Sequence, residues 1–236
     1  AAFFFKTPEI PANDESGFMG YPEAMKTFSG DGLACVRSNR IVFSGLEFSV
    51  SSGQALILSG PNGSGKSSLL RLMARITKPA AGRIIWNETD IEEDPETFFA
   101  DMHYVGHRDA VKPVLTVSEN LLFNAAVRKG SANINSALET VGLSALAGMP
   151  ARMLSAGQTR RRALARILAS PATIWLLDEP TIALDPPSVE RLIGAIAKHR
   201  AANGIVVAST NAPLGIDDAE SIDISDFGSG EETLWG

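Results

Sequence analysis

Residues 60–68 read Gly60-Pro61-Asn62-Gly63-Ser64-Gly65-Lys66-Ser67-Ser68 and match the phosphate-loop pattern G-x-x-x-x-G-K-[ST]. An apolar run typical of a buried strand, residues 55–58, precedes this loop, and apolar residues recur at helical spacing from Leu69 to Ile76 after it. Small residues let backbone N–H groups converge on phosphate oxygens, and the helix directs its positive end to the same place. We therefore expect residues 60–68 to bind a nucleoside triphosphate, with Lys66 at the β- and γ-phosphates and the Ser67 hydroxyl on Mg²⁺. A plain Gly/Ser turn before a core helix is the weaker alternative.

The bulk composition favours one large α/β domain. The chain has 236 residues, of which 44% are hydrophobic, and this is enough for one sizeable core. It contains no apolar run of the length, about 18 residues, that spans a bilayer. The formal net charge of −6 argues against a nucleic-acid partner bound by bulk electrostatics. Cys35 is the only cysteine, which excludes an intrachain disulfide and a cysteine zinc cluster.

The first 32 residues differ in composition from the rest. Phe3-Phe4-Phe5 is followed by prolines and acids without sustained periodicity. The apolar stretch is too short for a signal peptide, and the acids exclude an intact transit peptide, although a processed one could leave this remainder. We expect residues 1–32 to be a poorly ordered extension, with a docking arm as the alternative, and residues 33–236 to form the domain.

A second motif contains adjacent acids. Residues 173–180, Thr-Ile-Trp-Leu-Leu-Asp-Glu-Pro, form an apolar run that ends in Asp178 and Glu179. A buried strand would place Asp178 at its carboxyl end beside the phosphate loop, where open α/β sheets bind ligands. Asp178 would then hold Mg²⁺, and Glu179 would orient and polarise the attacking water. Alone the motif also fits a strand that runs into a turn, but together with residues 60–68 it predicts an ATPase.

A third motif, Leu154-Ser155-Ala156-Gly157-Gln158, precedes a helical stretch from Thr159 to Ala169. A Ser-x-Gly turn at a helix N-terminus can bind an anion, and Ser155 also fits an ordinary N-cap. This motif resembles the signature of the ATP-binding cassette (ABC) family. Together with the two other motifs, it makes the chain similar to this family over about residues 33–212. The resemblance implies a P-loop ABC fold with a mixed α/β core, an edge antiparallel sheet near residues 33–58 and 83–86, and a helical subdomain at about 108–170.

The ABC resemblance also implies an assembly. Two cassettes of this family pack head to tail, so that the signature of one, here Ser155 to Gln158, caps ATP held on the phosphate loop of the other. A homodimer with two equivalent sites is the simplest arrangement for a chain that carries both the phosphate loop and the signature. Asp185 resembles the D-loop residue that crosses to the partner, and it equally fits a helix N-cap before Pro186 and Pro187.

Further segments are similar to one branch of the ABC family. They are Arg83–Asn87, Tyr104–His107, Leu115–Leu121, Ile174–Leu177 and Gly204–Val207. With the signature they resemble the ATP-binding subunit of the haem-exporter-type complex of cytochrome c maturation, the CcmA family, including its plant mitochondrial members. The resemblance implies ATP and Mg²⁺ as cofactors, integral membrane subunits as partners, and a peripheral place on the nucleotide-bearing face of an inner membrane. The mitochondrial matrix side is slightly favoured over the bacterial cytoplasmic side.

Two positions depart from the usual ABC pattern. His107 stands where a glutamine usually ligates Mg²⁺ and approaches the attacking water; a neutral imidazole could accept from that water, and a plain loop histidine is the alternative. Arg37 stands where an aromatic residue usually stacks on adenine. A guanidinium plane can also stack on a base, and a solvated arginine on an edge strand fits the sequence equally well.

A third departure is Asn211, which falls where the family has a switch histidine that contacts the γ-phosphate. An asparagine amide can donate a hydrogen bond to phosphate, but it carries neither a proton nor a positive charge. Loss of a charge-assisted contact in the transition state slows the reaction. We therefore expect tight ATP binding and slow hydrolysis, with Glu179, His107 and Asn211 as the catalytic group.

Other conspicuous residues have structural interpretations. We expect Arg160, Arg161 and Arg162 to form a solvated helix face. Trp86 and Trp175 are expected to pack in the core, and His103 and His199 to be structural or exposed. Two other function classes stay open: a soluble ABC ATPase of an assembly machine, such as the iron–sulfur scaffold type, and a nucleotide-gated interaction module with little turnover.

Overall fold

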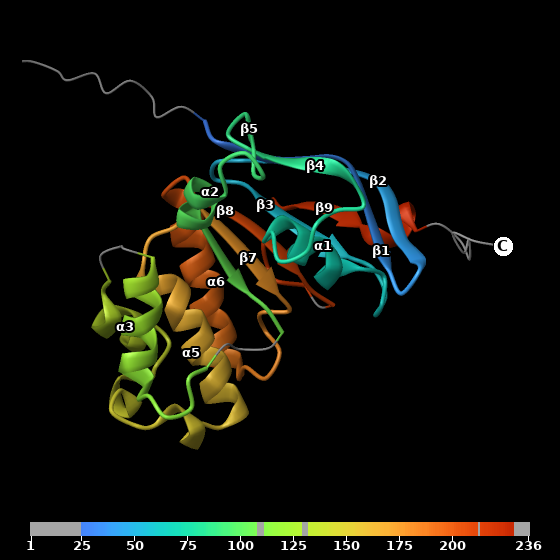
Figure 1. The fold of residues 1–236 in the computed structure, drawn as a ribbon. Helices are drawn as coiled ribbons and strands as arrows, with labels where there is room; N and C mark the ends of the chain where they lie inside the picture. Colours follow the sequence, from blue (N-terminus) through green and yellow to red (C-terminus); the bar gives the residue numbers. More distant parts are fainter. Residues whose placement is uncertain (1–24, 108–110, 129–131, 212, 229–236) are drawn as a thin grey trace, which may run out of the picture.

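Two β-sheets and a group of helices make up the chain (Figure 1). The structure, a computed structural model, describes residues 25–107, 111–128, 132–211 and 213–228. Most of the expected extension, residues 1–24, therefore lies outside the described part. The expected boundary at residue 33 is wrong, because the first strand begins at Thr27 and its residues already pair within a sheet.

An antiparallel sheet forms one layer, with the strand order β2-β1-β4-β5. Buried and exposed side chains alternate from Leu46 to Val50 on β2, as expected where one sheet face lies on the core. The sheet was predicted near residues 33–58, but residues 55–58 belong to the other sheet, because this apolar run is enclosed on both faces. The strands are β1 (Thr27–Arg37), β2 (Arg40–Ser51), β4 (Ala81–Trp86) and β5 (Thr89–Asp90).

A parallel sheet forms the centre, with the strand order β6-β7-β8-β3-β9. Its strands are β3 (Ala55–Ser59), β6 (Met102–Val105), β7 (Ile174–Asp178), β8 (Ile205–Ser209) and β9 (Glu220–Asp223). All residues of β7 and β8 are buried, which explains their continuous apolar sequences. Because all neighbouring pairs are parallel, the carboxyl ends of the strands meet at one edge, the usual ligand-binding edge of such sheets.

Helices cover both faces of the parallel sheet. The helix α1 (Lys66–Met73) lies between the two sheets, whereas α5 (Ala156–Ala169) and α6 (Pro186–Ala201) cover the opposite face (Figure 1). The helices α3 (Val117–Val127) and α4 (Ile134–Thr140) pack on α5 and form the helical subdomain with it. The remaining helical segments are α2 (Pro95–Asp101) and the 3₁₀ turns Ser144–Leu146, Ala151–Met153 and Ile224–Phe227.

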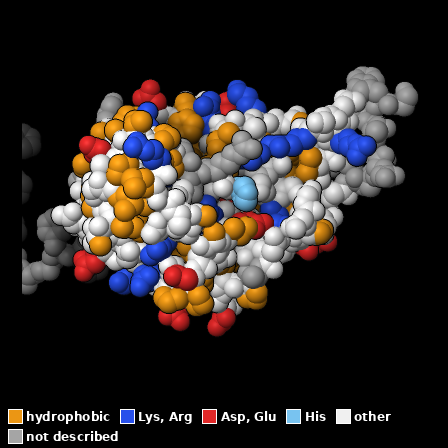
Figure 2. Space-filling model, turned by 90° about the horizontal axis from the view of Figure 1, so that it is seen from below, with side chains coloured by type: hydrophobic (Ala, Val, Ile, Leu, Met, Phe, Trp, Pro, Cys, Tyr) orange, Lys and Arg blue, Asp and Glu red, His pale blue; other side chains and the backbone are white. Residues whose placement is uncertain are grey.

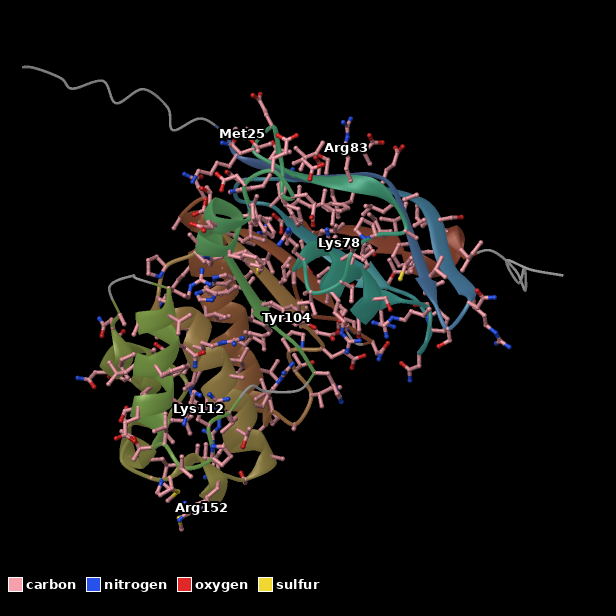
Figure 3. All side chains as sticks on the ribbon, in the orientation of Figure 1. Met25, Lys78, Arg83, Tyr104, Lys112 and Arg152 are labelled. Carbon is pink, nitrogen blue, oxygen red and sulfur yellow. The ribbon has the colours of Figure 1, made fainter. Side chains whose placement is uncertain are left out.

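The antiparallel sheet and the helical subdomain lie at opposite ends of the molecule. Figure 3 shows Arg83 on the former, Lys112 and Arg152 in the latter, and Tyr104 of β6 between them. One apolar cluster fills the space between the two sheets, and a second lies between the parallel sheet and α3 to α6. The parallel sheet is therefore supported from both sides, and its carboxyl edge provides a firm base for a site.

Two tryptophans and two histidines, Trp86, Trp175, His103 and His199, are structural, as expected. Trp86 is buried between the sheets, and the Trp175 ring stacks on His199 with 3.9 Å between centroids. His103 is buried, with Nε2 3.0 Å from a backbone carbonyl oxygen. Burial lowers the pKa of His103 to about 3 and that of His199 to about 4, so both rings are neutral near neutral pH.

Candidate nucleotide-binding site

The phosphate loop connects β3 to α1 at the carboxyl edge of the parallel sheet. Gly60 has a φ of 121° and Gly65 a φ of 111°, conformations that favour glycine. A Cβ atom on Gly65 would lie 2.7 Å from Cγ1 of Val42 on β2, and one on Gly60 would lie 2.8 Å from a carboxylate oxygen of Asp223. The antiparallel sheet and the end of β9 thus confine the loop. Seen from below, acidic and basic side chains gather around a histidine in a central hollow (Figure 2).

Lys66 extends its side chain over the phosphate loop. The residue is 5% exposed, and Nζ donates to the backbone carbonyls of Gly60 at 2.5 Å and Pro61 at 3.1 Å. The ammonium therefore lies among the backbone groups that the pattern assigns to phosphate binding. This position agrees with the predicted contact to the β- and γ-phosphates, which stays a prediction.

Three polar side chains meet beneath α1, at the ends of β7 and β8. Asp178 is fully buried, and its Oδ1 accepts from the hydroxyls of Ser67 at 2.9 Å and Ser209 at 2.7 Å. Its Oδ2 is buried and has no hydrogen-bond partner among the described residues. Such an oxygen is costly unless it finds a partner, and a divalent cation would supply one. A carboxylate beside a hydroxyl is an oxygen donor set that fits Mg²⁺.

Glu179 occupies a strained turn directly after β7. Its φ is 47°, a left-handed conformation uncommon for a residue with a side chain. The turn is held on both sides: the Glu179 N–H donates to the carbonyl and hydroxyl of Ser209 at 3.2 and 3.0 Å, and its carbonyl accepts from Arg160 at 2.7 Å. These hydrogen bonds therefore fix the backbone position from which the Glu179 side chain extends.

Asn211 lies beside Glu179, at the position where the switch residue was expected. Its Nδ2 donates to Glu179 Oε1 at 2.8 Å and to Asn62 Oδ1 of the phosphate loop at 3.1 Å. One amide thus bridges the carboxylate that we expect to hold the attacking water and the loop that we expect to hold the phosphates. Unlike an imidazolium, this amide donates hydrogen bonds without adding charge.

The signature residues form the tip of α5. Ser155 is the N-cap: its Oγ accepts from the N–H of Gln158 at 3.3 Å, and its N–H donates to Gln158 Oε1 at 2.9 Å. Ser155 and Ala156 are exposed. A Cβ atom on Gly157 would lie 2.9 Å from the Ala183 carbonyl, so this position needs a glycine. The N-cap role of Ser155 is confirmed, whereas its contact with a partner's ATP stays a prediction.

Asp185 has the N-cap role that the sequence offered as one of two possibilities. Its Oδ1 accepts from the Ser188 N–H at 3.0 Å at the start of α6. This hydrogen bonding holds the pKa of the exposed Asp185 carboxyl below its usual value. A D-loop contact to a partner stays a prediction, and an N-cap at an exposed helix start leaves room for it.

His107 and Arg37 are exposed at the edge of the site. His107 follows β6 at the edge that also carries Asp178, and the next residues, 108–110, lie outside the described part. Arg37 ends β1, opposite Arg40, on the strand pair that packs against the phosphate loop. Their contacts with the attacking water and with adenine stay predictions.

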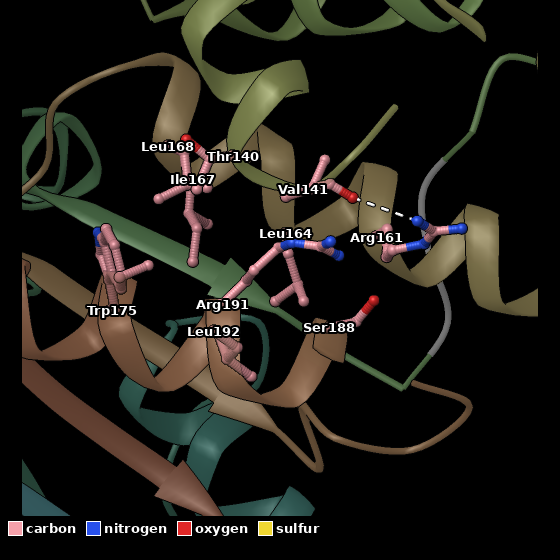
Figure 4. Close-up of a pocket in the computed structure, with 11 residues that line it drawn as sticks. Thr140, Val141, Arg161, Leu164, Ile167, Leu168, Trp175, Ser188, Arg191 and Leu192 are labelled. Carbon is pink, nitrogen blue, oxygen red and sulfur yellow. Dashed lines mark hydrogen bonds between the residues drawn. The ribbon is translucent and has the colours of Figure 1, made fainter. Parts of the chain in front are cut away.

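The arginines on α5 were misjudged from the sequence. Arg160 is 6% and Arg162 1% exposed, so the expected solvated face of residues 160–162 is wrong. Arg161 alone of the three is half-buried, and its Nη1 donates to the Val141 carbonyl at 3.4 Å beside a small cavity between α4, α5 and α6 (Figure 4). Helical spacing could have revealed the error, because Arg160 lies on the same face as Ala163 and Ile167.

Ser209 is a second residue that the sequence analysis missed. It ends the buried strand β8 and bonds both Asp178 and the Glu179 backbone. A polar residue at the carboxyl end of a continuous apolar run was the available signal, the same one that identified Asp178.

Comparisons with known proteins agree with this geometry. Residues 43–182 match the ABC transporter family. The chain is 53% identical over 212 residues to the cytochrome c biogenesis ATP-binding export protein CcmA of Paramagnetospirillum magneticum, covering 87% of this chain and 97% of that protein. The CcmA protein of Rhodospirillum rubrum is 50% identical, with 88% and 90% covered. A solved structure, the putative ABC transporter ATP-binding protein of Pyrococcus furiosus, has a TM-score of 0.76 and 25% identity and covers 86% of this chain.

These findings confirm the predicted fold. The two CcmA relatives named above are bacterial, so they give no support to the mitochondrial expectation. The family match spans the phosphate loop, the signature and the acids at the end of β7, which are the motifs that carried the resemblance. The chain belongs to the ABC transporter family and, within it, to the CcmA-type ABC ATPases.

Proposed function

We propose that the chain binds and hydrolyses ATP as a subunit of the ABC membrane complex that handles haem in cytochrome c maturation. As a CcmA-type member of the ABC family it is an ATPase. One observation carries the proposal: Ser67, Asp178 and Glu179 converge beside the phosphate loop. The CcmA names of relatives about half identical to the chain supply the process.

The roles follow from the positions of the side chains. Lys66, released from its loop carbonyls, would donate to phosphate oxygens, and the loop N–H groups would complete the cradle. Ser67 and Asp178 would hold Mg²⁺, which when bound supplies positive charge to the phosphates. Glu179 would orient the attacking water and accept its proton. His107 would line this site from the end of β6.

Hydrolysis by this site is expected to be slow. Asn211 donates to Glu179 and to the phosphate loop, so it can place the carboxylate. It cannot supply the charge that would oppose the growing negative charge on the phosphate oxygens. Positioning is therefore retained while one electrostatic contribution to the transition state is lost.

Two copies of the chain would form the working unit. The exposed tip of α5, with Ser155 to Gln158, would cap ATP bound to the phosphate loop of the partner, and Asp185 would lie near the contact. Exposure of Ser155 and Ala156 at the tip, and the presence of both the phosphate loop and the signature in one chain, support a head-to-tail homodimer. Each dimer would then contain two equivalent sites with the same asparagine.

Membrane subunits are the expected further partners. A groove between the sheet core and α3 is lined by both apolar and polar side chains, and its apolar residues Phe99 and Val127 are 41% and 67% exposed. This groove suits an amphipathic segment of an integral subunit. In the described residues, no helix combines the length and apolarity needed to cross a bilayer. We place the cassette on the nucleotide-bearing face of an inner membrane; its bacterial relatives favour no mitochondrial location.

Purification of the native chain from membranes in mild detergent tests the function. Polytopic membrane subunits should co-purify, and ATP turnover of the complex should fall when Glu179 is changed to Gln. Recovery of the chain with a soluble assembly scaffold, such as an iron–sulfur scaffold, and without membrane subunits would contradict the proposal.

A nucleotide-gated module is the second candidate, and Asn211 is the observation that favours it. If ATP serves only to close the dimer, the native chain and its Glu179→Gln variant should hydrolyse ATP at equal rates. A faster native rate would reject gating without catalysis.

A further inference from the structure

Arg160 is a buried cation on the signature helix. It lies about one turn beyond the tip of α5, and it is 6% exposed. Burial of a guanidinium is costly unless its N–H groups are used, and arginine offers five of them in a rigid, planar arrangement. Its hydrogen-bond partners therefore show what it holds together.

The Arg160 guanidinium binds the backbone of two catalytic segments at once. Nη2 donates to the carbonyls of Asp178 and Glu179, both at 2.7 Å, and Nε lies 3.4 Å from the carbonyl of Pro180. Nη1 donates to the carbonyl of Gly106 at 2.8 Å, directly before His107. One side chain thus joins the acid-bearing turn after β7 to the segment that follows β6.

A second arginine joins the same helix to the same strand. Arg166, further along α5, donates to the backbone carbonyl of Tyr104 in β6. The two contacts are six residues apart on the helix and two residues apart on the strand segment. α5 is therefore tied to this segment at two points, through which a displacement of the helix would reach the segment.

We propose that Arg160 is a positioning residue that couples the signature tip of α5 to the water-holding carboxylate of Glu179. The proposal rests on the proposed function, in which that tip caps ATP on a partner. Glu179 has a φ of 47°, and its carboxylate is 2.8 Å from Asn211, so a small shift of its carbonyl would change this contact. Closure on one site would thereby adjust the general base of the other.

The coupling makes a specific kinetic prediction. The hydrogen bonds of Arg160 described above run to backbone carbonyls of residues 106 and 178–180, which hold the turn that carries Glu179. Its loss should therefore lower kcat and leave ATP binding nearly unchanged. A residue that merely stabilises the fold would lower the fraction of folded, active protein without changing kcat per active site.

The test compares Arg160→Gln, Arg160→Lys and Arg161→Gln in the full chain. Arg161 is a matched control, because it lies on the same helix but faces Val141 (Figure 4). ATP affinity is measured with a fluorescent ATP analogue, and kcat is divided by the active-site concentration from nucleotide titration. Arg160→Gln should lower kcat about 10- to 100-fold with an ATP Kd within about twofold. Arg160→Lys, a single ammonium that cannot span the carbonyls, should lower kcat by about 3- to 10-fold.

The outcomes separate this inference from the function on which it rests. Equal kcat values for the wild type and both Arg160 variants, or an equal loss in Arg161→Gln, would overturn the coupling. If Arg160→Gln does not fold, the Lys variant decides by the same criteria. ATP-driven dimerisation of Glu179→Gln is measured in parallel; its absence would contradict the proposed function, whereas dimerisation with an unchanged kcat for Arg160 variants would contradict only this inference.

Discussion

The carboxyl edge of the parallel sheet and the tip of α5 differ in where their polar groups find hydrogen-bond partners. At the sheet edge, Ser67, Asp178 and Ser209 come from distant parts of the sequence, and both serine hydroxyls donate to Asp178. At the tip of α5, Ser155 and Gln158 are three residues apart in the sequence and bond each other, and Ser155 is exposed. The first end is the proposed cation and phosphate site, whose side chains all come from one chain. The second is a helix tip whose proposed ligand must come from another molecule.

The largest effect is expected from a substitution at the sheet edge that changes the chemistry of one side chain and preserves its shape. Glu179→Gln keeps the size of the side chain but removes the base, so turnover should fall about 100-fold or more. ATP affinity should stay within about twofold, because Lys66 and Asp178 are unchanged. Steady-state ATPase assays and nucleotide titration measure the two quantities. A variant as active as the wild type would remove Glu179 from the chemistry.

The next effect concerns Asn211, whose amide connects Glu179 to the phosphate loop at the sheet edge. Asn211→His should raise turnover about tenfold, because an imidazole can carry the charge that the amide lacks. Asn211→Ala, which removes the bridge to Glu179 and Asn62, should lower turnover instead. Opposite changes in these two variants would support the assigned position. Unchanged rates in both would show that residue 211 does not contact the reacting phosphate.

The helix tip is probed by a comparison of two N-caps. Ser155→Ala and Asp94→Ala each remove an N-cap hydrogen bond, at α5 and α2, and each should cost about 1 kcal/mol of unfolding free energy. Only Ser155→Ala should also lower turnover, by about threefold to tenfold, because only this cap belongs to the tip that we propose to contact a partner's ATP. Urea denaturation and ATPase assays give both numbers. Equal turnover in the two variants would assign Ser155 to helix capping alone.

The smallest effect concerns the pH dependence of stability of the core below the site. The pKa of His103 is about 3 in the folded chain, against an ordinary 6.5, so the unfolded chain takes up a proton first as pH falls. The stability that depends on neutral His103 is therefore present near neutral pH and is lost progressively below about 6.5. Between about pH 7.5 and 5.5, this residue should account for a loss of about 1 kcal/mol.

His103→Gln provides the control for the pH measurement. Glutamine does not titrate and can donate to the Ser170 carbonyl that now contacts the imidazole. Urea denaturation at the two pH values should give a smaller difference for the variant. An equal difference would show that other groups, such as His199, account for the acid sensitivity.

Much of the site could be predicted because its chemistry is carried by short motifs. The phosphate loop, the acids at the end of β7 and Asn211 each follow an apolar run, and parallel strands bring such ends together. What could not be predicted depends on contacts across the fold. The burial of Arg160 requires carbonyls of residues 106 and 178–180, which only the folded chain brings to one place.

The start of the domain was misplaced for a similar reason. Gly30 and Gly32 interrupt the alternation in β1, so residues 27–32 do not read as a strand. In the structure, a Cβ atom on Gly30 would lie 2.3 Å from the Phe48 ring of the neighbouring strand β2. The glycine is needed for this close packing, and the interrupted pattern is a consequence of the pairing.

The central claim, that ATP joins the phosphate loop of one copy to the α5 tip of another, is tested most directly by the mass of Glu179→Gln in solution. Light scattering coupled to size exclusion should give a monomer without nucleotide and a dimer with Mg²⁺ and ATP. Adding Ser155→Arg, which places a bulky side chain at the tip, should return the protein to a monomer. A Glu179→Gln chain that binds ATP and stays monomeric would contradict the account.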